Sequence, residues 1–312
     1  MATTILESQM IRAERRRAWR RSATGLLWAS PAILGFLLLY LGPMIASLGM
    51  SFTNWRIVDT PQWVGLENWV NMFTSDPLFY QSLRVSATYA LISVPLRLAL
   101  ALGIALLMNQ KHKLVGLFRT IYYLPSVIAG VSVALLWSWV FHPEFGVINV
   151  LLYDLFHIQG PRWLFDPNTA LASIIIMSLW SVGGSMLVYL GGLQGVPSDL
   201  YDAADVDGAG GFSKFRHVTL PMISPVLFFN LVMGFINSFQ AFTESFVMTG
   251  GGPVHSTRFF LLHLYQNAFI FFRMGYAAAL SWALFVIILA LTFFIFRSSS
   301  MWVFYEGEGN RG

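Results

Sequence analysis

The chain has 312 residues, of which 56% are hydrophobic and 11% are charged, and its formal net charge is +4. Globular chains carry roughly 25% charged residues, so a soluble protein of this size could not cover its surface with so few charges. A soluble cytoplasmic enzyme is therefore excluded. The sequence has no cysteine, which excludes disulfides, thiolate metal sites and iron–sulfur clusters.

The first 24 residues form a basic arm, which we expect on the cytoplasmic side of a membrane. Six arginines fall between positions 12 and 21, and an apolar run, Gly25–Phe52, follows them. This run is much longer than the roughly 7–15 residues of a signal-peptide core, so we interpret it as a retained first span. A basic arm can bind nucleic acid, but beside a span it is typical of a topology signal, and no nucleic-acid partner is expected.

Six apolar runs are long enough to cross about 30 Å of hydrocarbon as helices. They are Gly25–Phe52, Val85–Met108, Ile121–Phe141, Thr169–Leu190, Ile223–Met248 and Met274–Phe296. With the N-terminus inside, the inner segments hold 13 of the 19 Lys and Arg residues, which predicts that both termini are cytoplasmic. The predicted fold is therefore all-α and integral to the membrane: one six-span domain over 25–296, followed by a cytoplasmic tail over 297–312.

The inner loop between the fourth and fifth expected spans, residues 191–222, is long and acidic. Ser198 is typical of a helix start, because its hydroxyl can cap free backbone amides. We expect a short helix to about Asp207, a left-handed stop at Gly208 and a second short helix over Phe212–Val218, ended by a proline. Small side chains near the turn would let another surface approach closely. They are Ala203, Ala204 and Ala209.

This inner loop resembles the EAA loop of ATP-binding-cassette importer permeases. The matching residues are Tyr201–Ala209, Phe215 and Thr219–Pro221. Other segments resemble the carbohydrate-uptake branch of that family, and the resemblance runs from about residue 25 to residue 306. These segments are Gly65–Trp69, Asp76-Pro77, Phe118-Arg119, Leu124-Pro125, Thr249–Pro253 and Gly275–Ala278. Two positions depart from the family pattern: Asp202 replaces the usual Glu, and Gly211 replaces a residue that favours helix more strongly.

In that family the loop forms a coupling helix that sits in a cleft of an ATPase subunit. The resemblance implies the same docking role for Asp202, Ala203, Ala204, Asp207, Gly208 and Ala209. It also implies a second, similar permease subunit, two ATPase subunits that bind ATP and magnesium, and an extracytoplasmic solute-binding protein. The implied location is the plasma (inner) membrane of a bacterium or archaeon. From the residues alone, an ordinary capped surface loop is the alternative.

The sequence lacks the motifs with which it could supply its own energy. A phosphate-binding loop needs Gly-x-x-x-x-Gly-Lys followed by Ser or Thr, and none of the three lysines follows a glycine. The sequence also has no His-Glu-x-x-His pair. We therefore expect no ATP hydrolysis, no other enzyme activity, and no cofactor or metal in this chain.

Polar residues in the fifth expected span share one helical face. Asn230, Asn237 and Glu244 are seven residues apart, and Gln240 borders the same stripe. Polar groups that face lipid are costly, so the stripe is predicted to line a solute path, with contacts between helices as the rival interpretation. Arg97, in the middle of the second span, is expected to pair with a polar group such as Glu244. Direct contact with solute is the alternative.

Together these observations predict the permease subunit of an ATP-driven importer. The resemblance points to a sugar, an oligosaccharide or a glycerol-phosphate ester as cargo. An ion-coupled secondary transporter is the main alternative, but it would be expected to show inverted repeats or buried carboxylate relays, and neither appears. An intramembrane enzyme would need a nucleophile with its base, or metal ligands, among the spans, and the sequence contains no such cluster.

Overall fold

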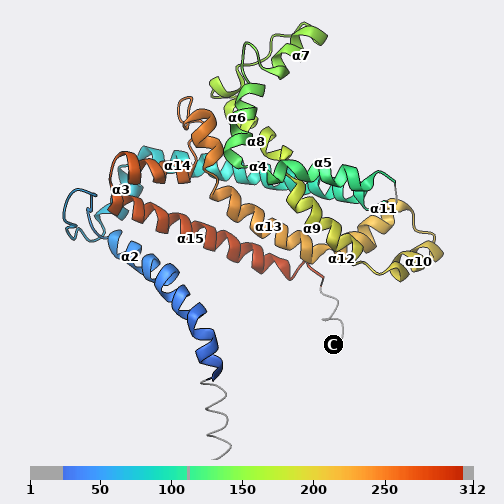
Figure 1. Cartoon of the computed structure of the whole chain (residues 1–312), viewed down its shortest axis with the longest axis horizontal. Coiled ribbons are helices and arrows are strands. Elements are labelled where there is room, and N and C mark those ends of the chain that lie inside the picture. Colours follow the sequence, from blue (N-terminus) through green and yellow to red (C-terminus); the bar gives the residue numbers. More distant parts are fainter. Residues whose placement is uncertain (1–23, 111–112, 305–312) are drawn as a thin grey trace, which may run out of the picture.

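The computed structural model describes residues 24–110 and 113–304. Nearly all of the basic arm and the last eight residues of the expected tail lie outside this description. The described secondary structure is helical, and its two β-bridges, Thr53 with Trp63 and Arg56 with Arg273, are isolated pairs. An all-α fold is therefore confirmed (Figure 1).

Three helices are long and apolar enough to cross a membrane on their own. The first, Thr24–Met50, contains a π-helical turn, η1 (Leu37–Leu41), followed by α2 (Gly42–Met50). The second is α4 (Pro77–Met108) and the third is α15 (Met274–Ser299). These helices match the first, second and sixth expected spans, although α4 begins eight residues earlier than predicted.

Two of the other three expected spans, the third and the fourth, are bent pairs of helices and not continuous helices. The pair α5 (Val115–Val127) and α6 (Gly130–Val140) is bent by 99°. The pair α8 (Ala170–Trp180) and α9 (Gly183–Gln194) is bent by 46°. By length and composition the described residues therefore contain three to six spans, depending on whether each bent pair crosses once.

The third bent pair joins the inner loop to the fifth expected span. Residues 211–222 form one helix, which turns by 66° into α13 (Ser224–Phe239). The bend lies at Ile223, where the backbone leaves helical geometry just before the proline that opens α13. Such a proline suits the first turn of a helix, because it has no N–H to leave unbonded.

Helix α4 lies at the centre of the packing and contacts α13, α9 and α8. Its crossing with α13 is close, because a Cβ atom on Gly234 would lie 2.9 Å from Cγ1 of Val94. Small residues at such crossings let two membrane helices approach each other. The start of α9 is equally tight, since a Cβ on Gly183 would lie 2.4 Å from the Tyr122 carbonyl oxygen of α5.

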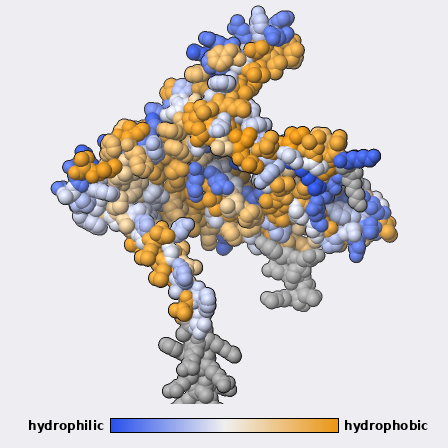
Figure 2. Space-filling view, viewed as in Figure 1, coloured by the Kyte–Doolittle hydropathy of each residue, from blue (hydrophilic) through white to orange (hydrophobic). Residues whose placement is uncertain are grey.

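Two elements project from this packed body. Figure 1 shows the first helix diverging from the bundle, and none of the 18 residues in its most apolar stretch is buried. Helix α7 (Val147–Phe156) projects on the other side of the body. Apolar residues cover much of the surface in Figure 2, as expected for a molecule surrounded by lipid.

Candidate functional site

The inner loop folds into α10 (Ser198–Val206) and a second helix made of α11 (Gly211–Lys214), η3 (Phe215–Thr219) and α12 (Leu220–Met222). Two details of the prediction are wrong. Pro197, not Ser198, occupies the N-cap position of α10, and no side chain caps it. Pro221 does not end the second helix, because the π-helical turn before it shifts the hydrogen bonds so that Leu220 N–H reaches the Phe215 carbonyl.

The turn between these helices has the predicted geometry. Helix α10 ends at Val206 with Asp207 as its C-cap, and Gly208 has a φ of +75°. This is the left-handed region that glycine adopts without strain. The expected left-handed stop is therefore confirmed.

Two contacts hold the helices of the inner loop together. Lys214 Nζ lies 2.8 Å from Asp205 Oδ1, and the hydroxyls of Tyr201 and Thr219 are 2.9 Å apart. The six predicted docking residues line the tip that these contacts support. Asp202, Ala203, Asp207 and Gly208 are exposed, and Ala204 and Ala209 are half-buried.

Sequence reasoning missed two exposed apolar side chains on the same tip. Val206 is 88% exposed and Phe212 is 75% exposed, one on each side of the Gly208 turn. Exposed apolar residues are common on this molecule, and these two are distinguished by lying beside the predicted docking residues. No periodic pattern in the sequence marks these two residues. Their position beside the aspartates of the loop could have indicated them.

The expected polar stripe is interrupted. Helix α13 ends at Phe239, residues 240–242 are not helical, and a π-helical segment, η4 (Ser245–Thr249), follows Glu244. Glu244 therefore does not lie on the same helical face as Asn230 and Asn237, because the helix is broken between them. Asn230 is buried and donates to the Val226 carbonyl at 3.0 Å, whereas Asn237 and Gln240 are exposed.

Several of these membrane polar groups are unpartnered. Across residues 24–110 and 113–304, the side chains of Asn237, Gln240, Glu244 and Arg97 make no hydrogen bond or ion pair with the protein. The expected pairing of Arg97 with Glu244 is therefore not formed.

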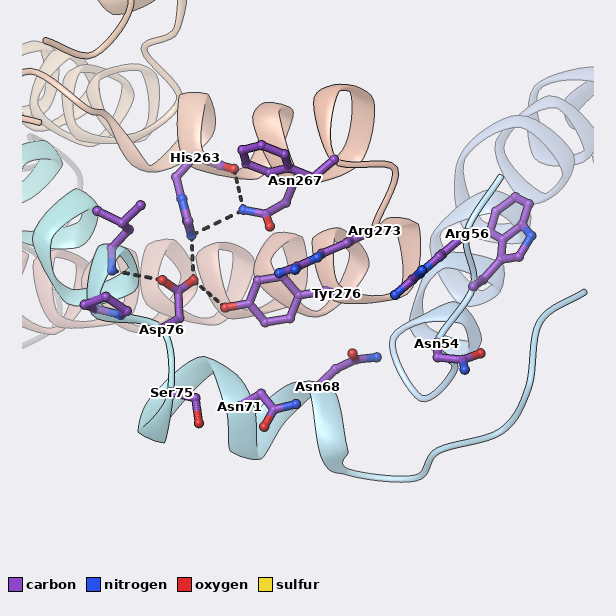
Figure 3. A pocket seen from close by; sticks show the side chains of 14 residues that line it. Asn54, Arg56, Asn68, Asn71, Ser75, Asp76, His263, Asn267, Arg273 and Tyr276 are labelled. Atoms are coloured by element: carbon purple, nitrogen blue, oxygen red, sulfur yellow. Dashed lines mark hydrogen bonds and ion pairs between the residues drawn. The ribbon is translucent and has the colours of Figure 1, made fainter. Parts of the chain in front are cut away.

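A cleft of about 700 Å³ opens beside helix α3 (Glu67–Thr74) (Figure 3), at the end of the molecule that lies opposite the inner loop in Figure 1. It lies between the segment that follows α2, helix α3, the start of α4, the π-helical turn η5 (Gln266–Ile270) and the start of α15. No local pattern in the sequence indicates this cleft, because its walls come from segments more than 200 residues apart, from Asn54 to Tyr276. Among the described residues, no group of His, Asp and Glu side chains could hold a metal ion.

Asp76 organises the floor of this cleft. Its Oδ1 accepts the Leu78 N–H at 2.9 Å, while its Oδ2 accepts the Tyr276 hydroxyl at 2.5 Å and lies 2.8 Å from His263 Nε2. Burial alone would raise the pKa of Asp76, but the bonds from Tyr276, His263 and Leu78 outweigh it and lower the pKa. Burial lowers the pKa of His263 despite the neighbouring carboxylate. At neutral pH, Asp76 is therefore ionised and His263 is neutral.

Two arginines are brought together at the same cleft. An isolated backbone bridge pairs Arg56 with Arg273, and the Gly275 N–H donates to the Trp55 carbonyl at 3.1 Å. This approach requires Gly275, since a Cβ there would lie 1.9 Å from the Thr53 carbonyl oxygen. Within the described part of the chain, neither guanidinium has a hydrogen-bond or ion-pair partner.

Comparisons with known proteins agree on one family. The sequence profile of the binding-protein-dependent transport system inner membrane components matches residues 97–300. The chain is 44% identical to the probable ABC transporter permease protein YesP of Bacillus subtilis (strain 168), over 91% of this chain and 93% of that protein. It is 33% identical to SmoG, the sulfoquinovosyl glycerol transport system permease protein of Agrobacterium fabrum, over 85% of this chain and 87% of that protein.

A solved structure shares the fold. The match is a chain of a bacterial ABC transporter involved in the import of the acidic polysaccharide alginate. The TM-score is 0.80 and the sequence identity 24%, covering 91% of this chain and 99% of that one. At this identity the likeness establishes the architecture alone.

Proposed function

The chain belongs to the binding-protein-dependent transport system inner membrane components, and from this premise we propose that it is the permease subunit of a sugar or oligosaccharide importer. As in the relatives named above, the chain is a transport subunit and not an enzyme. In the proposed importer, ATP with magnesium binds to partner ATPase subunits. A solute-binding protein delivers cargo from outside, and ATP-driven movement of the inner loop switches access to the path.

The exposed tip of the inner loop is the observation that carries this proposal. The aspartates and small residues around Gly208 face solvent, and Val206 and Phe212 flank them with exposed apolar surface. The Lys214–Asp205 contact holds the two helices of the tip together, so a push on α10 is passed to the helix that bends into α13. We propose that one ATPase subunit docks on this tip, and that a second docks on the equivalent loop of a partner permease.

The bent helix pairs support a six-span topology. If each pair crosses once, the described chain has six spans, and the charge bias of the sequence then places both termini in the cytoplasm. In Figure 1 the inner loop and the last turns of α15 lie toward the same end of the body, as this topology requires. The proposed location is the plasma (inner) membrane of a bacterium or archaeon.

The first helix supports a second permease subunit. A membrane helix with no burial in its own chain is free to pack on another subunit as well as on lipid. We propose that Thr24–Met50 contacts a similar permease, so that two permeases, two ATPases and the binding protein form the complete importer.

The unpartnered polar residues support a solute path near the end of α13. Asn237, Gln240 and Glu244 offer amide and carboxylate groups that the described chain leaves unused, and such groups recognise sugar hydroxyls. Lipid exposure of these groups would be costly, so water or solute at this position explains their lack of partners. A sugar-type cargo also agrees with the resemblance to the carbohydrate-uptake branch and with the sulfoquinovosyl glycerol system of the relative SmoG.

Purification of the chain from its native membrane in mild detergent tests this function. We expect an ATPase subunit and a second permease to co-elute with it, and ATP hydrolysis to rise when the cargo-loaded binding protein is added. An ion-coupled secondary transporter would instead elute without an ATPase and would accumulate cargo on a proton or sodium gradient alone. That outcome would reject the proposal.

A further inference from the structure

The cleft beside α3, which contains Asp76 and is called the outer cleft from here on, is separate from the proposed solute path. None of Asn230, Asn237, Gln240 and Glu244 lines it, and its walls come from α3, the start of α4, η5 and the start of α15. Its volume, about 700 Å³, is in the range of small-molecule sites. The cleft therefore needs an explanation of its own.

Two polar groups of the cleft are already bonded within the protein. The Asp76 carboxylate accepts from Leu78, His263 and Tyr276, so both of its oxygens are satisfied. The Asn68 side-chain nitrogen donates to the Ser51 and Thr53 carbonyls, 2.8 Å away in each case. The Asp76 carboxylate and the Asn68 nitrogen thus shape the cleft and are not available to hold a ligand.

The side chains that remain available include two arginines, which have donors and no acceptor. Arg56 and Arg273 have no hydrogen-bond or ion-pair partner among the described residues, and the amide of Asn71 is also unbonded there. Figure 3 shows Arg56 and Arg273 along one wall and Asn71 on the α3 wall opposite. The backbone bridge between the arginines holds their main chains side by side, so both guanidiniums reach the same opening.

We propose that this outer cleft is a binding site for a carboxylate, held by Arg56 and Arg273 with Asn71 on the opposite wall. A guanidinium presents its N–H groups in a planar fork that matches the two oxygens of a carboxylate, and paired forks add geometric selectivity. Trp55, Phe271 and Tyr276 also line the cleft and provide apolar faces beside this charge. The volume and the aromatic faces of the cleft favour the carboxylate of an acidic saccharide, and an acidic side chain of a docking protein is the alternative that the peptide probes test.

Matched probes test the proposal on the full chain in lipid nanodiscs, together with the subunits that co-purify with it. Binding is measured by saturation-transfer NMR without nucleotide, so the result does not depend on ATP coupling. Glucuronate is compared with glucose, which replaces the carboxylate by a hydroxymethyl group. A blocked Gly-Glu-Gly peptide is compared with Gly-Gln-Gly. The pair with the larger preference for its acidic member identifies the source of the carboxylate.

Variants connect the binding to the cleft. We expect at least one acidic probe to bind tenfold more tightly than its neutral partner, and the double variant R56Q/R273Q to lose that preference. R56K/R273K keeps the charge and should retain part of the preference. R162Q removes an equally exposed arginine outside this cleft and should stay within twofold of the native chain. Asn71→Asp, a nearly isosteric change on the opposite wall, should weaken acidic probes and spare neutral ones.

Two results would overturn the proposal. One is equal binding of acidic and neutral probes in both pairs. The other is an acidic preference that R162Q reduces as much as R56Q/R273Q does. If the double variant fails to elute as the native complex does, the response of N71D decides: an unchanged acidic preference in N71D rejects the site, and a reduced one supports it.

Discussion

Asp76 shows how a single residue holds several helices together at the cleft. It caps the first turn of α4, and its second oxygen ties α14 (Phe260–Tyr265) and α15 to that turn through His263 and Tyr276. In the sequence, the Asp76-Pro77 pair contributes only to the family resemblance, and no helix start is predicted there. The partners of Asp76 were not predicted either, because they lie 187 and 200 residues away along the chain.

The lowered pKa of His263 predicts a loss of stability in mild acid. Because burial depresses this pKa below its ordinary value of 6.5, the unfolded chain takes up a proton before the folded chain does as the pH falls below about 6.5. The midpoint of thermal unfolding in detergent should therefore fall by several degrees between pH 7 and the lower pKa of the folded state. Asp76, whose pKa is also lowered, adds to this loss only below its ordinary value of 3.8.

His263→Gln should remove this pH step, since a Gln amide can still donate to Asp76 but does not titrate. His157→Gln, at an exposed histidine on the C-cap of α7, is the matched control and should keep the step. A step of native size in the His263→Gln variant would show that another group controls the acid response.

Arg97 distinguishes a solute contact from a structural ion pair. A buried pair is strongly destabilised when one partner is removed, by about 3–5 kcal/mol. Arg97 has no such partner among the described residues, so Arg97→Leu should leave the unfolding midpoint unchanged or raise it, while cargo uptake falls at least tenfold. Arg84→Leu, at an exposed arginine of the same helix, should leave both quantities near native values. A lower midpoint with normal uptake in Arg97→Leu would support the structural interpretation.

At the scale of elements, the sequence predicted where the apolar segments lie but not how they bend. Long apolar runs locate α4 and α15 because burial in lipid depends on composition alone. The bends follow from local backbone geometry, such as the extended Ala129 between α5 and α6, which hydropathy does not report. The predicted polar stripe assumed one continuous helix. Because α13 ends at Phe239, Glu244 is not part of that helix.

The α4–α13 crossing gives a direct test of packing. Gly234→Ala would place its Cβ 2.9 Å from Val94 Cγ1, and overpacking of this kind costs typically about 1–3 kcal/mol. We expect a lower unfolding midpoint for Gly234→Ala and recovery in the double variant with Val94→Ala, which removes the clashing methyl groups. Gly103→Ala, in α4 with no atom near its added Cβ, is the control and should not destabilise the chain. Absence of recovery in the double variant would contradict this account of the crossing.

The exposed apolar pair of the inner loop tests docking without disturbing the fold. Val206→Ser with Phe212→Ser changes only side chains that solvent already reaches, so the unfolding midpoint should move little. We expect co-purification of the ATPase subunit to fall at least tenfold, because the partner loses its apolar contacts. Val254 lies in the loop between η4 and α14 and is 78% exposed, so Val254→Ser is matched in exposure. This control variant should not change the recovery of the ATPase subunit. Normal ATPase recovery with the double variant would remove these two residues from the interface.

For the whole molecule, the composition, the charge bias and the loop motif of the sequence predicted the class of protein and its family. The shortage of charge indicated a membrane protein, and the residues around Gly208 indicated the family that the comparisons confirm. The unburied first helix and the unpartnered polar groups were beyond sequence reasoning, because each depends on which surfaces one chain leaves uncovered. These same features support the proposal that the chain works with partner subunits.

We propose that this chain is a conduit driven by an ATPase subunit docked at the Asp202–Gly208 turn. ATP-driven uptake into proteoliposomes tests this proposal most directly, with the assembled importer and a cargo identified by thermal-shift screening of its binding protein against sugars. The variant replaces residues 202–208 by a Gly-Ser linker of equal length. We predict that uphill accumulation is lost while the spans remain folded and the binding protein still takes up cargo. Accumulation at the native rate with the linker, or on an ion gradient without ATP, would contradict the claim.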